Sequence, residues 1–83
     1  MQKSIHTPEY RLLVDLLRAS REELKVSQAQ VAERLGISAS QLSKWERRER
    51  RIDLLELSRY CDAAGIDLIE LIGTWRERAT FKD

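Results

Sequence analysis

The 83-residue sequence predicts an all-α fold, a single compact domain of five helices that spans residues 1–83. Four apolar-periodic segments are each preceded by Ser or Asp with Glu or Gln three residues later, a pattern that satisfies the free N–H groups of a helix N-terminus. A fifth segment follows a Thr-Pro pair, and proline suits the first helical turn. Only 3 Gly, 1 Pro and 42% hydrophobic residues are typical of a small helical domain.

The start and end of each helix can be read in chain order. Thr7 caps the first, and the capping pairs of the others are Ser27 with Gln30, Ser38 with Gln41, Asp53 with Glu56 and Asp67 with Glu70. Gly36 and Gly65 end the second and fourth helices, because glycine turns left-handed at low cost. We therefore expect helices from about Pro8 to Leu24, Gln28 to Leu35, Ala39 to Arg47, Leu54 to Ala64 and Leu68 to Ala79.

Apolar residues at helical spacing define the predicted core. They are Leu13, Leu17, Leu24, Val31, Leu35, Ile37, Leu42, Leu54, Leu57, Cys61, Ile66, Leu68, Leu71 and Ile72. Trp45 could stack on bases, but its position favours packing beneath the following loop. With no second thiol in the chain, Cys61 is expected to be buried and inert.

The composition argues against several classes of protein. One Cys and one His cannot form a disulfide or a structural zinc site, so we expect no metal and no cofactor. The sequence has neither a catalytic constellation nor a phosphate-cradling glycine loop, and we expect no enzymatic activity. No apolar run is long enough to span a membrane and no signal peptide is recognisable. These features predict a cytoplasmic protein without a membrane partner.

The charge is distributed unevenly although the formal net charge is only +1. Residues 1–19 carry a balance of +1, residues 20–51 of +3 and residues 52–83 of −3. A basic middle suits contact with phosphates, and an acidic end suits a partner or solvent. An ordinary surface of mixed charge is equally consistent with these balances.

A short connection that contains Gly36 joins the second and third predicted helices, which is the sequence form of a helix-turn-helix over residues 27–47. Small Ala32 lies where the two helices cross, and Ile37 and Leu42 point to the core. The residues left on the opposite face of the third helix are Ala39, Ser40, Ser43 and Lys44.

The segment that reads VSQAQVAERLGISASQLSKWERRERRID resembles the helix-turn-helix of the Cro and lambda-repressor-like family of phage and bacterial transcriptional regulators. The resemblance extends loosely over residues 8–75. It implies a lambda-repressor-like fold whose third helix lies in the major groove of a double-stranded DNA operator, commonly as a homodimer on two half-sites.

The resemblance also implies roles for particular residues. Ala39, Ser40, Ser43 and Lys44 match the base-reading positions, where Lys44 could donate to guanine and Ala39 could contact a thymine methyl group. The phosphate-binding positions are matched by Gln28 and, after the third helix, by Arg47, Arg48, Arg50 and Arg51, with Gln41 as a further neighbour. The arginine run could instead be a solvated face, and the two serines could be plain exposed residues.

Two further features follow from the resemblance. Arg21 and Glu46 match a semi-buried salt bridge that orients the first helix against the third. The family has glycine where this sequence has Lys25 and Arg48, so left-handed residues there would be strained by roughly 1 kcal/mol.

The last predicted helix, within residues 67–79, carries more apolar surface than a small core needs. Ile69, Ile72 and Trp75 are therefore candidates for a dimer interface, although Trp75 could simply cover its own core. The leading hypothesis is a homodimeric repressor that binds a DNA operator. The alternative is an antitoxin-like or adaptor protein that binds a partner protein through its acidic C-terminal third and retains DNA binding.

Overall fold

The computed structural model describes residues 7–79. Within this range the chain forms five helices and no strand, as the sequence predicts: α1 (Pro8–Glu23), α2 (Gln28–Leu35), α3 (Ala39–Glu46), α4 (Leu54–Ala64) and α5 (Leu68–Arg78). The first, third and fifth helices end one residue earlier than expected, and the other bounds agree. None of the described helices has the length and apolarity that a membrane crossing requires.

The helix ends are formed by the predicted caps. Ser27, Ser38 and Asp53 each accept a hydrogen bond from the third helical N–H, and the Gln or Glu at that position accepts one from the backbone N–H of the cap. Asp67 accepts from the N–H of Glu70 in the same way. Gly36 and Gly65 have φ of 71° and 79°, the left-handed conformation that ends α2 and α4.

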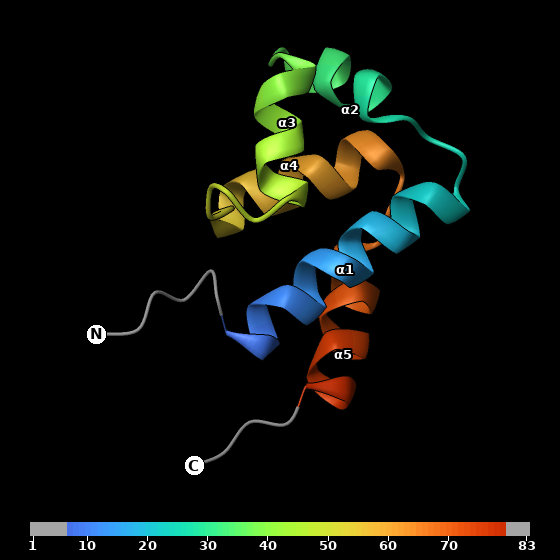
Figure 1. Cartoon of the computed structure of the whole chain (residues 1–83). Coiled ribbons are helices and arrows are strands. Elements are labelled where there is room, and N and C mark those ends of the chain that lie inside the picture. The colour runs from blue at the N-terminus through green and yellow to red at the C-terminus, as the bar shows by residue number, and fades with distance from the viewer. Residues whose placement is uncertain (1–6, 80–83) are drawn as a thin grey trace.

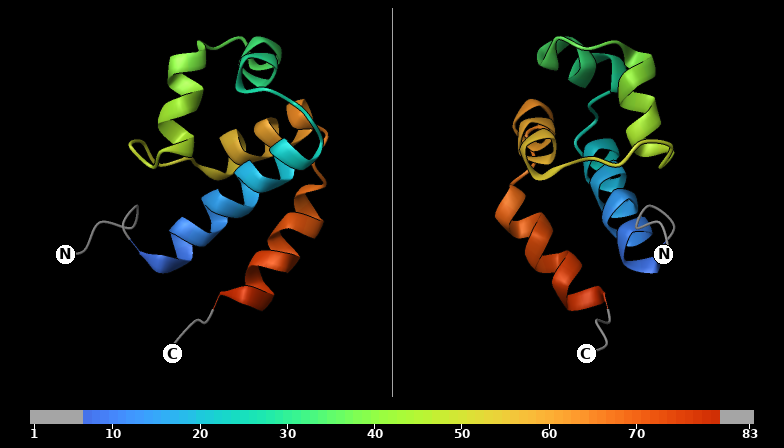
Figure 2. Two further views of the ribbon diagram at one scale, coloured as in Figure 1. Left: turned by 45° about the vertical axis from the view of Figure 1, so that its right-hand side comes forward. Right: turned by 90° about the vertical axis from the view of Figure 1, so that its left-hand side faces the viewer.

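The helices pack into two halves that share one core. α2 packs against α3 and α4, while α1 packs against α3 and α5 (Figure 1). Both views of Figure 2 show α3 at one end of the molecule and the last turns of α5 at the other. The recognition-helix candidate α3 therefore lies far from the candidate dimer helix α5.

The core is centred on α4 and the inner face of α1. Its largest fully buried side chains are Tyr60, Leu17, Leu42, Val14, Val31 and Cys61. Burial raises the pKa of the Cys61 thiol to about 11, and the charges of Asp62 and Asp67 act in the same direction, so the thiol stays protonated near neutral pH. Trp45 is also buried, as its helical position suggests.

Two predicted core residues are wrong. Leu24 is 49% exposed because α1 has already ended and the chain turns away at this residue. Leu54 is 71% exposed because it is the first residue of α4 and lies on the outer side of that helix. The core also contains residues that the spacing rule did not select, chiefly Tyr10, Val14 and Tyr60.

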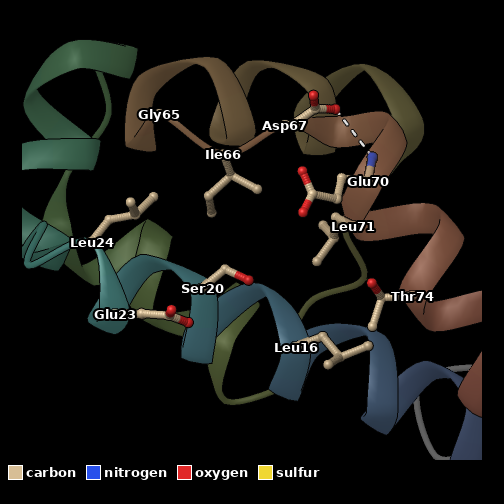
Figure 3. Close-up of a pocket in the computed structure, with 10 residues that line it drawn as sticks. All are labelled: Leu16, Ser20, Glu23, Leu24, Gly65, Ile66, Asp67, Glu70, Leu71 and Thr74. Atoms are coloured by element: carbon tan, nitrogen blue, oxygen red, sulfur yellow. Dashed lines mark hydrogen bonds between the residues drawn. The ribbon is translucent and has the colours of Figure 1, made fainter.

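A hollow of about 300 Å³ lies between the C-terminal half of α1 and the start of α5 (Figure 3). Leu24, Ile66 and Leu71 are among the apolar side chains that line it. Three carboxylates also line it, those of Glu23, Asp67 and Glu70. Among residues 7–79, no three His, Cys, Asp or Glu side chains form a group that could hold a metal ion.

Candidate nucleic-acid interface

Helix α3 presents a polar face to solvent. Leu42, Trp45 and Glu46 are buried against the rest of the domain. Because α-helical residues advance about 100° each, the opposite face carries Ser40, Lys44 and Arg47 at its centre. Of the residues that the sequence assigns to base reading, Ala39, Ser40 and Lys44 are exposed and Ser43 is half-buried.

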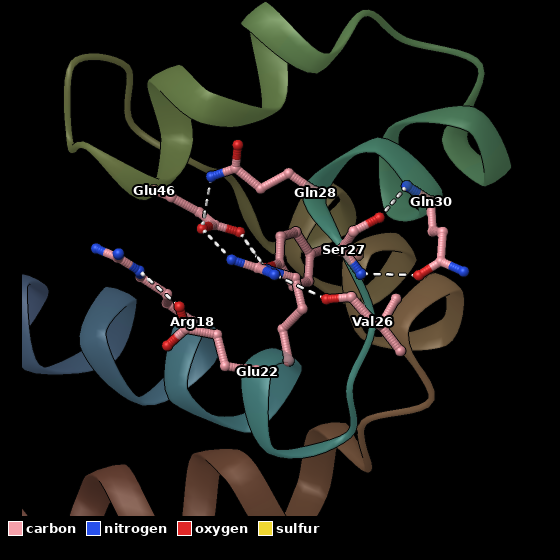
Figure 4. A network of polar contacts seen from close by, with 9 residues as sticks. Arg18, Glu22, Val26, Ser27, Gln28, Gln30 and Glu46 are labelled. Atoms are coloured by element: carbon pink, nitrogen blue, oxygen red, sulfur yellow. Dashed lines mark hydrogen bonds and ion pairs between the residues drawn. The ribbon is translucent and has the colours of Figure 1, made fainter.

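The C-terminal end of α3 is held by a buried polar network around Glu46 (Figure 4). The Arg21 guanidinium pairs with the Glu46 carboxylate through two hydrogen bonds, Nε to Oε2 at 2.8 Å and Nη2 to Oε1 at 2.9 Å. The hydroxyl of Tyr60 donates to Oε2 at 2.5 Å, and the Gln28 amide donates to Oε1 at 2.9 Å. The carboxylate therefore joins α1, α2 and α4 to the end of α3.

The network is buried and saturated with hydrogen bonds. The side chains of Arg21 and Glu46 are only 8% and 1% exposed. Burial alone would raise the pKa of Glu46, but hydrogen bonds from Arg21, Tyr60 and Gln28 outweigh it and lower the pKa below its ordinary value. Burial and the hydrogen bond to this carboxylate raise the pKa of Tyr60. The pair is thus ionised at neutral pH and has a structural role.

The N-terminus of α2 lies beside α3 because Gln28 bridges to Glu46. The side-chain amide of Gln28 uses one N–H for this hydrogen bond, which leaves its second N–H and its oxygen free of contacts within the described residues. Gln41, the other predicted phosphate-binding glutamine, accepts the N–H of Ser38 with Oε1 at 3.1 Å. Its amide N–H groups donate to no group within the described residues.

The arginines that follow α3 differ in what they contact. The Arg47 guanidinium pairs with Glu49 at 2.8 Å, and that of Arg48 reaches Asp15 of α1 at 3.5 Å. Arg50 pairs with Glu56 at 3.0 Å and lies 5.8 Å from the centre of the Trp45 ring. Arg51 is exposed and has no contact of this kind within residues 7–79.

Comparison with known proteins identifies this arrangement. A sequence model of the Helix-turn-helix family matches residues 17–71. A solved structure described as an XRE-family like protein from Pseudomonas syringae pv. tomato str. DC3000 superposes with a TM-score of 0.85 at 34% identity, covering 93% of this chain and 94% of the other. No curated protein sequence matches the chain.

The chain belongs to the Cro/C1-type helix-turn-helix family. It is therefore a DNA-binding transcription regulator with the five-helix fold of that family. The turn between α2 and α3 in this family member contains Gly36 in the left-handed conformation, and the backbone N–H of Ile37 donates to Ala32 at 3.0 Å.

Two positions for which the family resemblance implies glycine adopt the left-handed conformation here. Lys25 has φ of 63° and Arg48 has φ of 61°. The N–H of the next residue then reaches back to a helical carbonyl, from Val26 to Arg21 at 3.2 Å and from Glu49 to Lys44 at 2.8 Å. Both turns therefore form despite the steric cost of a side chain in the left-handed conformation.

The candidate dimer residues of α5 do not share one environment. Ile69 is 80% exposed, whereas Ile72 packs partly against the core. Trp75 is half-buried and donates its Nε1–H to the carbonyl of Glu9 at 2.8 Å, which ties the end of α5 to the start of α1. The structure thus brings Trp75 onto its own domain rather than to the outer face that carries Ile69.

Sequence reasoning missed the two tyrosines that support the interface. Tyr60 holds Glu46, and the Tyr10 hydroxyl accepts the N–H of Ile52 at 3.0 Å, which fixes the end of the arginine loop to α1. Neither contact has a local signature, because the partners are 14 and 42 residues apart. The helical phase of Tyr60 beside Leu57 and Cys61 was the one available signal.

Proposed function

We propose that the protein is a sequence-specific repressor that binds its operator as a homodimer, with α3 in the major groove. The observation that carries this proposal is the position of Lys44. Its side chain is exposed on the central outer face of α3 and has no ion pair or hydrogen bond within the described residues. An unpaired lysine beside Ala39, Ser40 and Ser43 suits donation to guanine O6 or N7.

The phosphate contacts of the proposed complex surround this face. The N-terminus of α2 with Gln28 would bind one phosphate, because the helix dipole and free N–H groups favour an anion there. Gln41 and the arginine loop would bind others. The loop residues assigned to this role are Arg47, Arg48, Arg50 and Arg51.

The proposed dimer forms through α5. Ile69 is an exposed large apolar residue on the outer side of this helix. Gly73 lies one turn further along, and a Cβ added there would meet nothing within 4 Å, so the isolated domain does not require glycine at this place. Glycine within a helix costs about 1 kcal/mol relative to alanine, and close approach of a second α5 would explain it.

In vitro selection of bound DNA with the purified protein tests this function. We expect a palindromic consensus with half-sites about one helical turn apart, and binding that weakens steeply with added salt. Light scattering is expected to give a dimer that Ile69→Glu converts to a monomer. Selection that yields no preferred sequence would contradict the proposal.

A second candidate function is an antitoxin-like or adaptor role in the cytoplasm. The observation that favours it is the hollow between α1 and α5, whose apolar floor is surrounded by Glu23, Asp67 and Glu70 (Figure 3). It lies away from α3, so a protein partner with basic and apolar side chains could bind without covering the DNA-binding face. A stoichiometric partner that copurifies with the wild type but not with a Leu24→Glu variant would support this function, whereas a clean homodimer without partner would count against it.

A further inference from the structure

A second hollow, of about 330 Å³, lies between α3 and α4. Its floor is apolar, formed by Leu35, Ile37 and the buried Trp45. Its polar lining comes from three different parts of the chain: α3, the loop that follows it, and α4. The polar side chains are Gln41, Lys44, Arg50, Glu56 and Arg59.

The charges around this hollow do not balance. Glu56 is its one carboxylate, and both oxygens of that group are used, by Arg50 at 3.0 Å and by the backbone N–H of Asp53 at 3.0 Å. The side chains of Lys44 and Arg59 have no ion pair or hydrogen bond within residues 7–79. Two unpaired cations from separate helices thus share one concave surface, which attracts an anion.

The position of the hollow indicates which anion this is. On α3, Ala39 and Gln41 lie about 160° apart, so they are on opposite flanks of the outward face. The side of α3 that carries Ala39 also carries Glu46, which accepts a hydrogen bond from Gln28 at the start of α2. The flank of Gln41 borders the hollow. A helix in the major groove has one sugar-phosphate backbone on each side.

We infer that Arg59 of α4 binds a backbone phosphate of the DNA strand opposite to the strand contacted by the N-terminus of α2. This inference rests on the proposed function and extends the interface to α4, outside the helix-turn-helix and the arginine loop.

The test measures DNA affinity as a function of salt for wild type, Arg59→Ala and Arg59→Lys on the selected operator. One lost phosphate contact lowers the slope of log K against log salt by about 0.9 per protomer, which is about eightfold in affinity at 0.1 M salt. We expect this loss for Arg59→Ala, on selected and random DNA alike, and a smaller loss for Arg59→Lys. Arg78→Ala, which removes the same charge from the far end of α5, is the matched control and should leave the slope unchanged.

A strand-resolved measurement completes the test. Operators with a single neutral methylphosphonate at successive positions are titrated with wild type, Arg59→Ala and Gln28→Ala. We expect one position whose neutralisation weakens the wild type but no longer weakens Arg59→Ala, on the strand opposite to the position coupled to Gln28. An unchanged salt slope, or coupling of both residues to the same strand, would overturn the inference while specific operator binding still upheld the proposed function. Loss of all sequence preference in the wild type would instead overturn the proposed function.

Discussion

The buried network around Glu46 and the loop that follows α3 both contain arginine–glutamate pairs. The two sets of pairs differ in burial and in their further partners. Arg21 and Glu46 are buried, bidentate and joined by Tyr60 and Gln28. The Arg47–Glu49 pair of the loop is exposed, with both side chains more than half exposed. The side chain of Lys44, on the same helix as Glu46, has no ion pair or hydrogen bond within the described residues.

This difference separates a structural use of charge from a binding use. A buried pair with every lone pair satisfied cannot turn to a ligand, and it fixes the angle of α3 against α1. Exposed pairs contribute little to folding stability, and the arginine of such a pair can exchange its carboxylate partner for a phosphate. We therefore expect substitutions in the network to lower stability, and substitutions in the loop and on the outer face of α3 to lower DNA affinity.

The largest expected effect is that of Glu46→Ala. This change leaves the guanidinium of Arg21 buried without a counter-ion and should lower the free energy of unfolding by about 3–5 kcal/mol. Urea denaturation measures it. Glu49→Ala is the matched control and should change stability by less than about 1 kcal/mol. Equal losses from the two variants would contradict the distinction between the network and the loop.

Acid should remove part of the stabilisation that is lost in Glu46→Ala. The pKa of Glu46 is lowered in the folded protein, so the folded state favours the ionised form. Its contribution is therefore fully present above the ordinary value of 4.5 and is lost as the pH falls below 4.5 through the lower folded-state pKa. Denaturation between pH 7 and pH 3 should show this decline, with salt having little influence because the pair is buried. A flat profile down to pH 3 would argue against the pairing.

Tyr60→Phe should have a smaller effect on the same network. It removes one hydrogen bond to a buried carboxylate, worth about 1.5–3 kcal/mol, without removing the ring from the core. NMR titration should also find the pKa of Glu46 higher than in the wild type, because a hydrogen bond to the ionised form is lost. Unchanged stability together with an unchanged pKa would mean that Tyr60 acts only through packing.

Replacing the two left-handed residues by glycine should give the smallest change in the free energy of unfolding, and this change should be a gain rather than a loss. Lys25→Gly and Arg48→Gly should each stabilise the domain by about 1 kcal/mol, since glycine adopts a positive φ without steric cost. Lys25→Ala should bring no such gain. Arg48→Gly should at the same time weaken DNA binding, because it removes a loop cation assigned to phosphate contact, and a gel-shift titration measures that loss.

The sequence predicted most of the fold because the helix ends have local causes. Capping residues and the glycines Gly36 and Gly65 act within four residues of the bonds they control, so the bounds could be placed within one residue. The core was less predictable at helix ends. Leu24 and Leu54 have the correct spacing, but the chain leaves the helix there and the spacing rule no longer applies.

The interface was predicted unevenly for a related reason. The outward face of α3 follows from helical phase, but the partners of each arginine depend on distant elements. Asp15 lies 33 residues before Arg48, and no local pattern joins them. Tyr60 and Arg59 likewise reach their surroundings only when α4 packs against α2. Long-range polar contacts are thus the part of this site that needed the structure.

The most direct test of the account is the affinity of wild type and Lys44→Ala for a panel of operators that carry every single base-pair change. If Lys44 reads a base, the wild type should discriminate by about 1–3 kcal/mol at one position in each half-site. Lys44→Ala should lose that discrimination while its unfolding curve stays unchanged. An identical discrimination profile in the two proteins would contradict the claim that the unpaired face of α3 reads DNA.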